Sequence, residues 1–259
     1  MLILLPPSES KDRPPSEDAS RMDLRSLSLP ALTTARETML RAVQRTAAGA
    51  DGAARLGVPA SAPELTERMA HLDQEPVAAP LEVYSGVLFD QLAPDTQVVA
   101  DRTVLIQSAL LGLVDAATDR IPAYRVSATS RVQRLGTAGT WWRKHLAPVA
   151  VDLHEQLAAS ASPLVIDCRS GAYRSMMPMR STEQVRVLQV SPVQERGGVR
   201  KVVSHDAKRY RGWVTRVLLD ATCPPATGQE TLELLRAGFD GTLGVELEGD
   251  ELVVVDRVD

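Results

Sequence analysis

Short, largely apolar runs recur along the chain, and polar residues follow each of them directly. Residues 2–5 precede a Pro-Pro pair and two serines, residues 104–107 precede Ser108, and residues 164–167 precede a Cys-Arg-Ser sequence. Runs of this length, bounded by prolines and polar residues, are typical of buried strands. They fall far short of the roughly 20 apolar residues that cross a bilayer. The pattern predicts a sheet whose strands end in polar loops, and no membrane span.

Stretches with helical spacing of apolar residues separate these strands. Helices are expected over 29–48, after the capping-box pattern at 61–64, and over 80–93, 138–158 and 207–219. Further strands are expected at 185–190, at 199–203 and within the acidic segment 243–257. Such alternation predicts an α/β or α+β fold with a mixed sheet covered by helices. At 259 residues and 44% hydrophobic content, with no internal repeat or evident linker, the chain is predicted to form one compact domain over 1–259.

Charge is distributed unevenly along the chain. The overall net charge is −4, which by itself speaks against a nucleic-acid binder. Residues 169–216, however, hold eleven Lys or Arg against three acids, and residues 217–259 hold ten acids against two Arg. The two segments could pair as surface ions, or the first could form a basic face for a phosphate-bearing partner. Both alternatives stay open at the level of sequence.

Composition narrows the environment and the chemistry. The N-terminal apolar run has no basic residue ahead of it and no small-residue cleavage site, so it does not fit a signal peptide. Cys168 and Cys223 stand apart from other metal-ligand residues, which argues against a disulfide framework and against structural zinc. No His and carboxylate spacing fits a facial triad. We therefore expect a cytoplasmic protein without a metal site or cofactor, and an inert Cys168.

Polar residues gather where the predicted strands end, which is where α/β sheets bind ligands. Ser8, Ser10 and Lys11 follow the first strand, Ser108 ends another, and Arg169 follows a third. Each could equally be an ordinary turn residue, Tyr84 could be a core tyrosine, and Arg125, next to Tyr124, could pair with Asp115 or Asp119. The ligand alternative groups them around an anion.

The helix expected at 207–219 carries the densest set of cations. Lys208, Arg209, Arg211 and Arg216 lie along it, Ser204 could cap its start, and His205 is the one histidine in a setting suited to proton transfer. Helical spacing places some of these cations on one face. If Lys11 and Lys208 share one cleft, the first and last motifs form a single site.

Six motifs occur in an order and spacing that resemble the YaaA family, also called peroxide stress proteins. They are Leu-Ile-Leu-Leu-Pro-Pro-Ser-Glu-Ser-Lys at 2–11, Val-Tyr-Ser-Gly at 83–86, Gln-Ser-Ala-Leu-Leu-Gly at 107–112, Pro-Ala-Tyr-Arg at 122–125, Val-Ile-Asp-Cys-Arg-Ser-Gly-Ala-Tyr at 165–173 and Ser-His-Asp-Ala-Lys-Arg-Tyr-Arg-Gly-Trp-Val-Thr-Arg at 204–216. The resemblance implies a single-domain α/β fold, a cytoplasmic location, survival of peroxide stress, DNA binding and an influence on iron, and no established reaction. The chain departs from the family pattern at Ser10, Ala207 and Arg143, which is compatible with a specialised paralogue.

Two functions follow as hypotheses. In the first, the protein binds DNA non-specifically, and cations of the 207–219 helix contact phosphates. In the second, it is an enzyme on a nucleotide, nucleoside or nucleobase, with anion-holding cations and a proton-transfer group in one pocket. The candidate catalytic residues are Lys11, Tyr84, His205 and Lys208. The candidate anion or nucleic-acid contacts are Ser8, Ser10, Ser108, Tyr124, Arg125, Arg169, Ser204, Arg209, Arg211 and Arg216.

Overall fold

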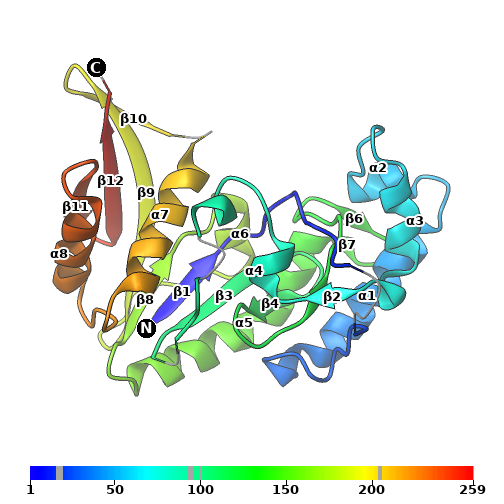
Figure 1. The fold of residues 1–259 in the computed structure, drawn as a ribbon. Helices are drawn as coiled ribbons and strands as arrows, with labels where there is room; N and C mark the ends of the chain where they lie inside the picture. The colour runs from blue at the N-terminus through cyan, green and yellow to red at the C-terminus, as the bar shows by residue number, and fades with distance from the viewer. Residues whose placement is uncertain (16–19, 93–95, 100, 204–205, 259) are drawn as a thin grey trace.

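The computed structural model describes residues 1–15, 20–92, 96–99, 101–203 and 206–258. Within these residues the strands form one eight-stranded sheet in the order β11-β12-β9-β8-β1-β3-β4, with β10 paired to β9 (Figure 1). Its strands are β1 (Leu2–Leu5), β3 (Thr103–Ser108), β4 (Gly112–Asp115), β8 (Leu164–Asp167), β9 (Arg186–Arg196), β10 (Val199–Val202), β11 (Gly244–Glu248) and β12 (Glu251–Arg257). Two short pairs lie apart, β2 (Val77–Ala78) with β5 (Ile121–Pro122) and β6 (Arg131–Val132) with β7 (Gly136–Thr137).

The centre of the sheet is parallel and its edges are antiparallel. Strand β1 pairs in parallel with β3 on one side and β8 on the other, and β9 continues the parallel set through β12. Strands β4, β10 and β11 add antiparallel edges. All four residues of β1 are at most 1% exposed, as expected for a parallel strand covered on both faces. The predicted mixed α/β sheet is confirmed.

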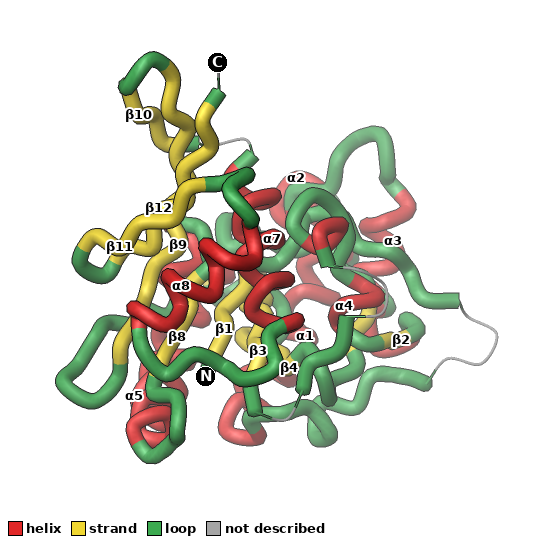
Figure 2. Tube along the Cα trace, turned by 60° about the vertical axis from the view of Figure 1, so that its left-hand side comes forward, coloured by secondary structure: helices red, strands yellow, loops and turns green. Residues whose placement is uncertain are grey.

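Helices cover both faces. Helices α7 (Ala207–Asp220) and α8 (Gly228–Phe239) lie together on one side, and α5 (Ala138–Ala158) lies on the other (Figures 1 and 2). Helices α1 (Thr33–Ala47), α2 (Gly52–Leu56) and α3 (Glu64–Ala70) gather beyond β4, at the right of Figure 1. Short elements complete the cover, namely α4 (Pro80–Val83), α6 (Gly171–Met176) and the 3-10 turns η1 (Pro30–Leu32), η2 (Leu72–Gln74) and η3 (Phe89–Gln91). No described helix has the length and apolar character of a membrane span.

The contact between α5 and the β3–β4 turn is unusually close. Trp142 of α5 is fully buried, and its indole nitrogen donates to the carbonyl of Ala109 at 2.8 Å. Gly112 opens β4 at φ +80°, and a Cβ built there would come within 2.7 Å of the Trp142 ring. Both the backbone conformation and the available space therefore require glycine at this position. This packing fixes the turn that follows Ser108.

Several predicted elements are confirmed, and two predictions need correction. The strands 2–5 and 164–167 and the helix 138–158 have the predicted bounds. The helix expected over 80–93 is wrong, because α4 ends at Val83 and the chain turns through extended Tyr84 and Gly86 at φ +95°. The capping box at 61–64 is also wrong, because α3 begins after Pro63 without a side-chain cap. Helices α2 and α8 were not predicted.

Candidate functional site

The carboxyl ends of β1 and β8 open onto one cavity of about 440 Å³, as parallel neighbours in a sheet dictate. The loop after β1 forms one wall and the start of α6 another, while α7 and the segment 125–129 close it. We call this cavity the Lys11 cleft. Its polar lining consists of Ser8, Glu9, Lys11, Arg125, Ser127, Thr129, Ser170, Tyr173, Lys208 and Arg211. Motifs separated by almost 200 residues thus meet in one place, where both Lys11 and Lys208 line the cavity.

Lys11 is held by the segment that breaks the expected helix at 80–93. Its backbone forms a β-bridge with Tyr84, and the amide of Asp12 donates to the carbonyl of Val83 at 2.8 Å. The Lys11 ammonium donates to the carbonyl of Ser8 at 2.6 Å and lies 4.2 Å from the centre of the Tyr124 ring. Burial, helped by the nearby cations Arg125 and Lys208 and opposed by Glu9, lowers the pKa of Lys11 to about 7.

Three buried hydroxyls next to Lys11 form a hydrogen-bonded series. The Tyr84 and Tyr124 hydroxyls are 2.8 Å apart, and the Tyr124 hydroxyl is 2.7 Å from Ser108 Oγ. Ser108 Oγ also accepts the amides of Leu110 and Leu111, so both of its lone pairs are occupied and its own proton points toward Tyr124. Burial raises the pKa of both tyrosines well above 10, which keeps them protonated. Lys11 therefore lies against the rings of two neutral tyrosines.

Three more cations line the cleft. Arg125 donates to the carbonyl of Gly57 and pairs with Glu9 at 3.4 Å, so the suggested pairing with Asp115 or Asp119 is wrong. Asp119 instead accepts from the amide and hydroxyl of Ser28. Within the described part of the chain, no carboxylate pairs with Lys208 or Arg211. The Nε of Arg211 is buried without a hydrogen-bond partner there, and burial lowers its pKa. The partnerless, desolvated nitrogen makes Arg211 a candidate contact for an anion.

Known proteins similar in sequence identify the family of this chain. The family model described as peroxide stress protein YaaA matches residues 1–237. The chain belongs to the YaaA family. A UPF0246 protein of Streptomyces coelicolor is 36% identical over 262 aligned residues, covering 96% of this chain and 93% of that protein. UPF0246 proteins of Corynebacterium glutamicum and Corynebacterium efficiens are 34% and 35% identical, each aligned over more than nine-tenths of both chains. The resemblance predicted from six motifs is confirmed.

Arg169 lies outside the cleft of this YaaA-family protein, contrary to its predicted role as an anion contact. It is fully buried, and its guanidinium donates twice to the carboxylate of Asp167, at 2.9 and 2.8 Å, and once to Gln107 at 2.8 Å. Asp167 also lies 3.8 Å from Arg174. The donors of Arg169 are directed at side chains of β8 and β3, so this residue ties together the two strands that flank β1.

Two cations of α7 point away from the cleft. Arg209 and Arg216 line a separate cavity of about 490 Å³ beside Trp213, between α7 and α8. Arg209 pairs with Asp206 at 3.7 Å and Arg216 with Asp220 at 2.5 Å. The helix therefore divides the predicted cationic set between two faces, because positions 208 and 211 face one way and positions 209 and 216 another.

The remaining predicted residues have mixed outcomes. Ser10 is exposed, and its carbonyl accepts from Ser8 Oγ. Ser204 and His205 lie outside the described residues. Tyr173, which the sequence analysis did not single out, lines the cleft, and burial raises its pKa to about 12. The position of Tyr173 at the start of a helix directly after β8 was the available signal.

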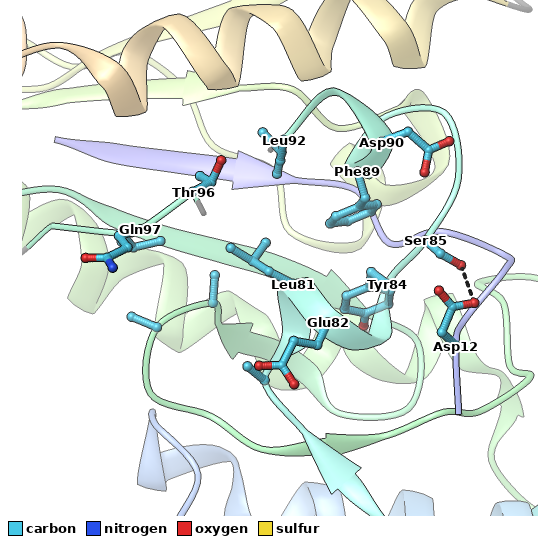
Figure 3. A pocket seen from close by; sticks show the side chains of 14 residues that line it. Asp12, Leu81, Glu82, Tyr84, Ser85, Phe89, Asp90, Leu92, Thr96 and Gln97 are labelled. Atoms are coloured by element: carbon cyan, nitrogen blue, oxygen red, sulfur yellow. Dashed lines mark hydrogen bonds between the residues drawn. The ribbon is translucent and has the colours of Figure 1, made fainter. Parts of the chain in front are cut away.

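A larger cavity, of about 700 Å³, lies on the other side of the 83–86 segment (Figure 3). Its charged lining is acidic, from Asp12, Glu82 and Asp90, around the apolar Leu81 and Phe89. Asp12 and Ser85 point toward one another at 3.2 Å in Figure 3. The described residues form no group of metal-ligand type. Cations are absent from the described lining, so this cavity is unsuited to a phosphate and the Lys11 cleft is the better candidate.

Proposed function

We propose that this YaaA-family protein binds a phosphate-bearing small molecule of the nucleotide class in the Lys11 cleft and acts on it chemically. The observation that carries the proposal is the convergence of Lys11, Arg125, Lys208 and Arg211 on one cavity, three of them without a described carboxylate partner. A cavity of about 440 Å³ is within the range that holds small ligands, roughly 300–1,000 Å³. The family's association with peroxide stress supplies the setting in which such a reaction would be used.

The lining of the cleft supports recognition of both halves of a nucleotide. The four cations could bind the phosphate. The hydroxyls of Ser8, Ser127 and Ser170 provide hydrogen-bond donors and acceptors for a sugar. The apolar side chains of Leu56 and Val126 lie in the same cavity, where a base could pack. A double helix about 20 Å wide would not enter a cavity of this size, so the inner cations favour a small molecule.

Non-specific DNA binding is a second candidate, favoured by the hairpin of β9 and β10. This hairpin extends beyond the body of the protein (Figures 1 and 2) and exposes Arg196 and Lys201. Arg200, on the same hairpin, pairs with Glu195 and Glu246 at 2.8 and 2.7 Å. A two-stranded ribbon can enter the major groove and contact phosphates. The exposed cations of the hairpin support such a contact.

Ligand-induced thermal stabilisation separates the two candidates. Wild-type protein, Lys208→Gln and the control Arg209→Gln are heated with pyrophosphate, adenosine monophosphate or adenosine. Phosphate-bearing ligands should raise the Tm of wild type and of Arg209→Gln, and Lys208→Gln should weaken apparent affinity about tenfold, as loss of a charge-assisted contact implies. If none of the phosphate ligands stabilises the protein, the proposal fails.

DNA binding is measured in parallel by fluorescence anisotropy between 50 and 200 mM salt. Phosphate contacts predict a steep loss of affinity with salt, and Lys201→Glu should abolish binding while Lys208→Gln leaves it largely intact. This outcome would favour the hairpin as the functional surface. A flat salt response would eliminate the DNA candidate.

A further inference from the structure

Lys11 differs from the other three lysines of the chain. Lys144, Lys201 and Lys208 are exposed, whereas Lys11 is partly buried and its amine lies over the faces of Tyr84 and Tyr124. Within the described residues, the one hydrogen bond of its Nζ goes to the carbonyl of Ser8, and no carboxylate lies within ion-pair distance. A carbonyl accepts from a neutral amine as well as from an ammonium, although the bond from the ammonium is the stronger. Nothing in this environment therefore requires the charged form.

The neighbours of Lys11 favour an unprotonated amine at neutral pH. Burial removes water from the ammonium, and Arg125 and Lys208 repel a further positive charge. The aromatic faces act in the opposite direction, since they attract a cation. The resulting pKa of about 7 makes both forms available. Desolvation beside other cations is a recognised way of making a lysine nucleophilic.

We propose that Lys11 forms an imine with an aldehyde or ketone carbonyl of a phosphate-bearing ligand, such as a phosphosugar in its open-chain form, whose phosphate is held by Arg125, Lys208 and Arg211. This inference rests on the proposed function, because it places the anionic half of the ligand in the same cleft. It differs from a purely electrostatic role, in which Lys11 would stay charged and contact the phosphate itself.

The step balances without a co-reactant. The lone pair of Nζ attacks the carbonyl carbon, and the carbonyl π electrons move to oxygen. A proton passes from nitrogen to that oxygen, a second protonation allows water to leave, and the nitrogen loses its remaining proton as the C=N bond forms. The products are the imine and one water, and nothing is oxidised or reduced. Water in the open cleft exchanges these protons.

Borohydride trapping with a phosphate-bearing aldehyde tests the inference directly. Wild-type protein is incubated with pyridoxal 5′-phosphate at pH 7.5, reduced with sodium borohydride, digested and mapped by mass spectrometry. Labelling of Lys11 should exceed that of Lys144 and Lys201 at least about tenfold, because the cleft holds the phosphate of the probe beside the desolvated Lys11 amine. Labelling of Lys11 should rise as the pH passes through 7. Lys11→Arg keeps a cation and should lose the label.

A phosphate-free probe separates failure of the inference from failure of the proposed function. Pyridoxal should label Lys11 much less than pyridoxal 5′-phosphate does, and Arg125→Gln should remove the difference. Equal labelling by both aldehydes would overturn the phosphate site and with it the proposed function. Labelling of Lys11 no greater than that of Lys144 at every pH, while inorganic phosphate still raises the Tm of the protein, would overturn the imine alone.

Discussion

Replacement of Arg169 by methionine tests whether this residue holds the fold or binds the ligand. Its side chain is inaccessible to solvent, and Asp167, which it contacts through two hydrogen bonds, is 2% exposed. Methionine fills most of the volume but leaves the Asp167 carboxylate with the backbone amide of residue 169, at 3.0 Å, and the more distant Arg174, at 3.8 Å. Breaking a buried pair by removing one partner costs about 3–5 kcal/mol. A loss of that size in the free energy of unfolding is expected for Arg169→Met.

The loss is measured by urea unfolding followed by circular dichroism, with Arg186→Met as the matched control. Arg186 pairs with Asp250 at 3.0 Å, but both side chains are nearly half exposed, so its removal should cost less than about 1 kcal/mol. For a chain of this size the Arg169→Met loss corresponds to a fall in Tm of roughly 6–20 °C. The double variant Asp167→Leu/Arg169→Met should recover part of the loss, because no buried charge is then left uncompensated.

One result would refute this reasoning. If Arg169→Met unfolds within about 1 kcal/mol of wild type and instead loses affinity for phosphate-bearing ligands, Arg169 is an anion contact, as the sequence analysis predicted. Retained ligand affinity in the folded variant, together with lowered stability, would establish the structural role that its burial indicates.

Three further predictions concern the packing and charge around the cleft. Gly112→Ala should destabilise by at least about 2 kcal/mol, because a methyl group there meets Trp142 at 2.7 Å and φ is +80°; a urea midpoint near wild type would contradict the packing. Tyr124→Phe should cost about 1–3 kcal/mol by leaving buried Ser108 and Tyr84 hydroxyls without their shared partner, and calorimetric unfolding measures it. Lys11→Met should remove a pH dependence of the free energy of unfolding. The pKa of Lys11 is about 7 in the folded protein and higher in the unfolded chain, so the unfolded chain binds more protons between pH 7 and 10. Over that range the stability of wild type should therefore rise with pH, by up to about 1.4 kcal/mol per pH unit. Parallel pH profiles of unfolding for the two proteins would show that Lys11 is an ordinary solvated lysine.

The uneven charge distribution shows how far sequence reasoning reaches. Surface pairing and a basic cleft were open alternatives, and the structure contains elements of both. Arg200 pairs with Glu246 and Arg186 with Asp250, so acids of the C-terminal segment neutralise part of the basic segment. Lys208 and Arg211 have no such partner among the described residues and face the Lys11 cleft. Charge counts along a chain cannot distinguish these groups, because pairing depends on which strands become neighbours.

The sequence by itself determined the elements whose signals are local. Apolar runs ended by prolines set β1, helical spacing set α5, and polar residues after strands indicated the edge of the sheet where the cleft lies. Six motifs in one order were enough to indicate the family, which the family model over residues 1–237 confirms. Each of these signals can be read within a few neighbouring residues, where backbone sterics and side-chain periodicity act.

Only the tertiary structure decided which of the polar residues became a site. Arg169 and Arg211 both belong to the basic segment 169–216. Arg169 pairs with the buried Asp167, whereas Arg211 lies in the cleft without a described partner. The break at Tyr84 likewise arises because that residue bridges to Lys11, more than 70 positions earlier. Desolvation and charge pairing depend on contacts between distant segments, so the lowered pKa of Lys11 arises only when β1, β8 and α7 are brought together.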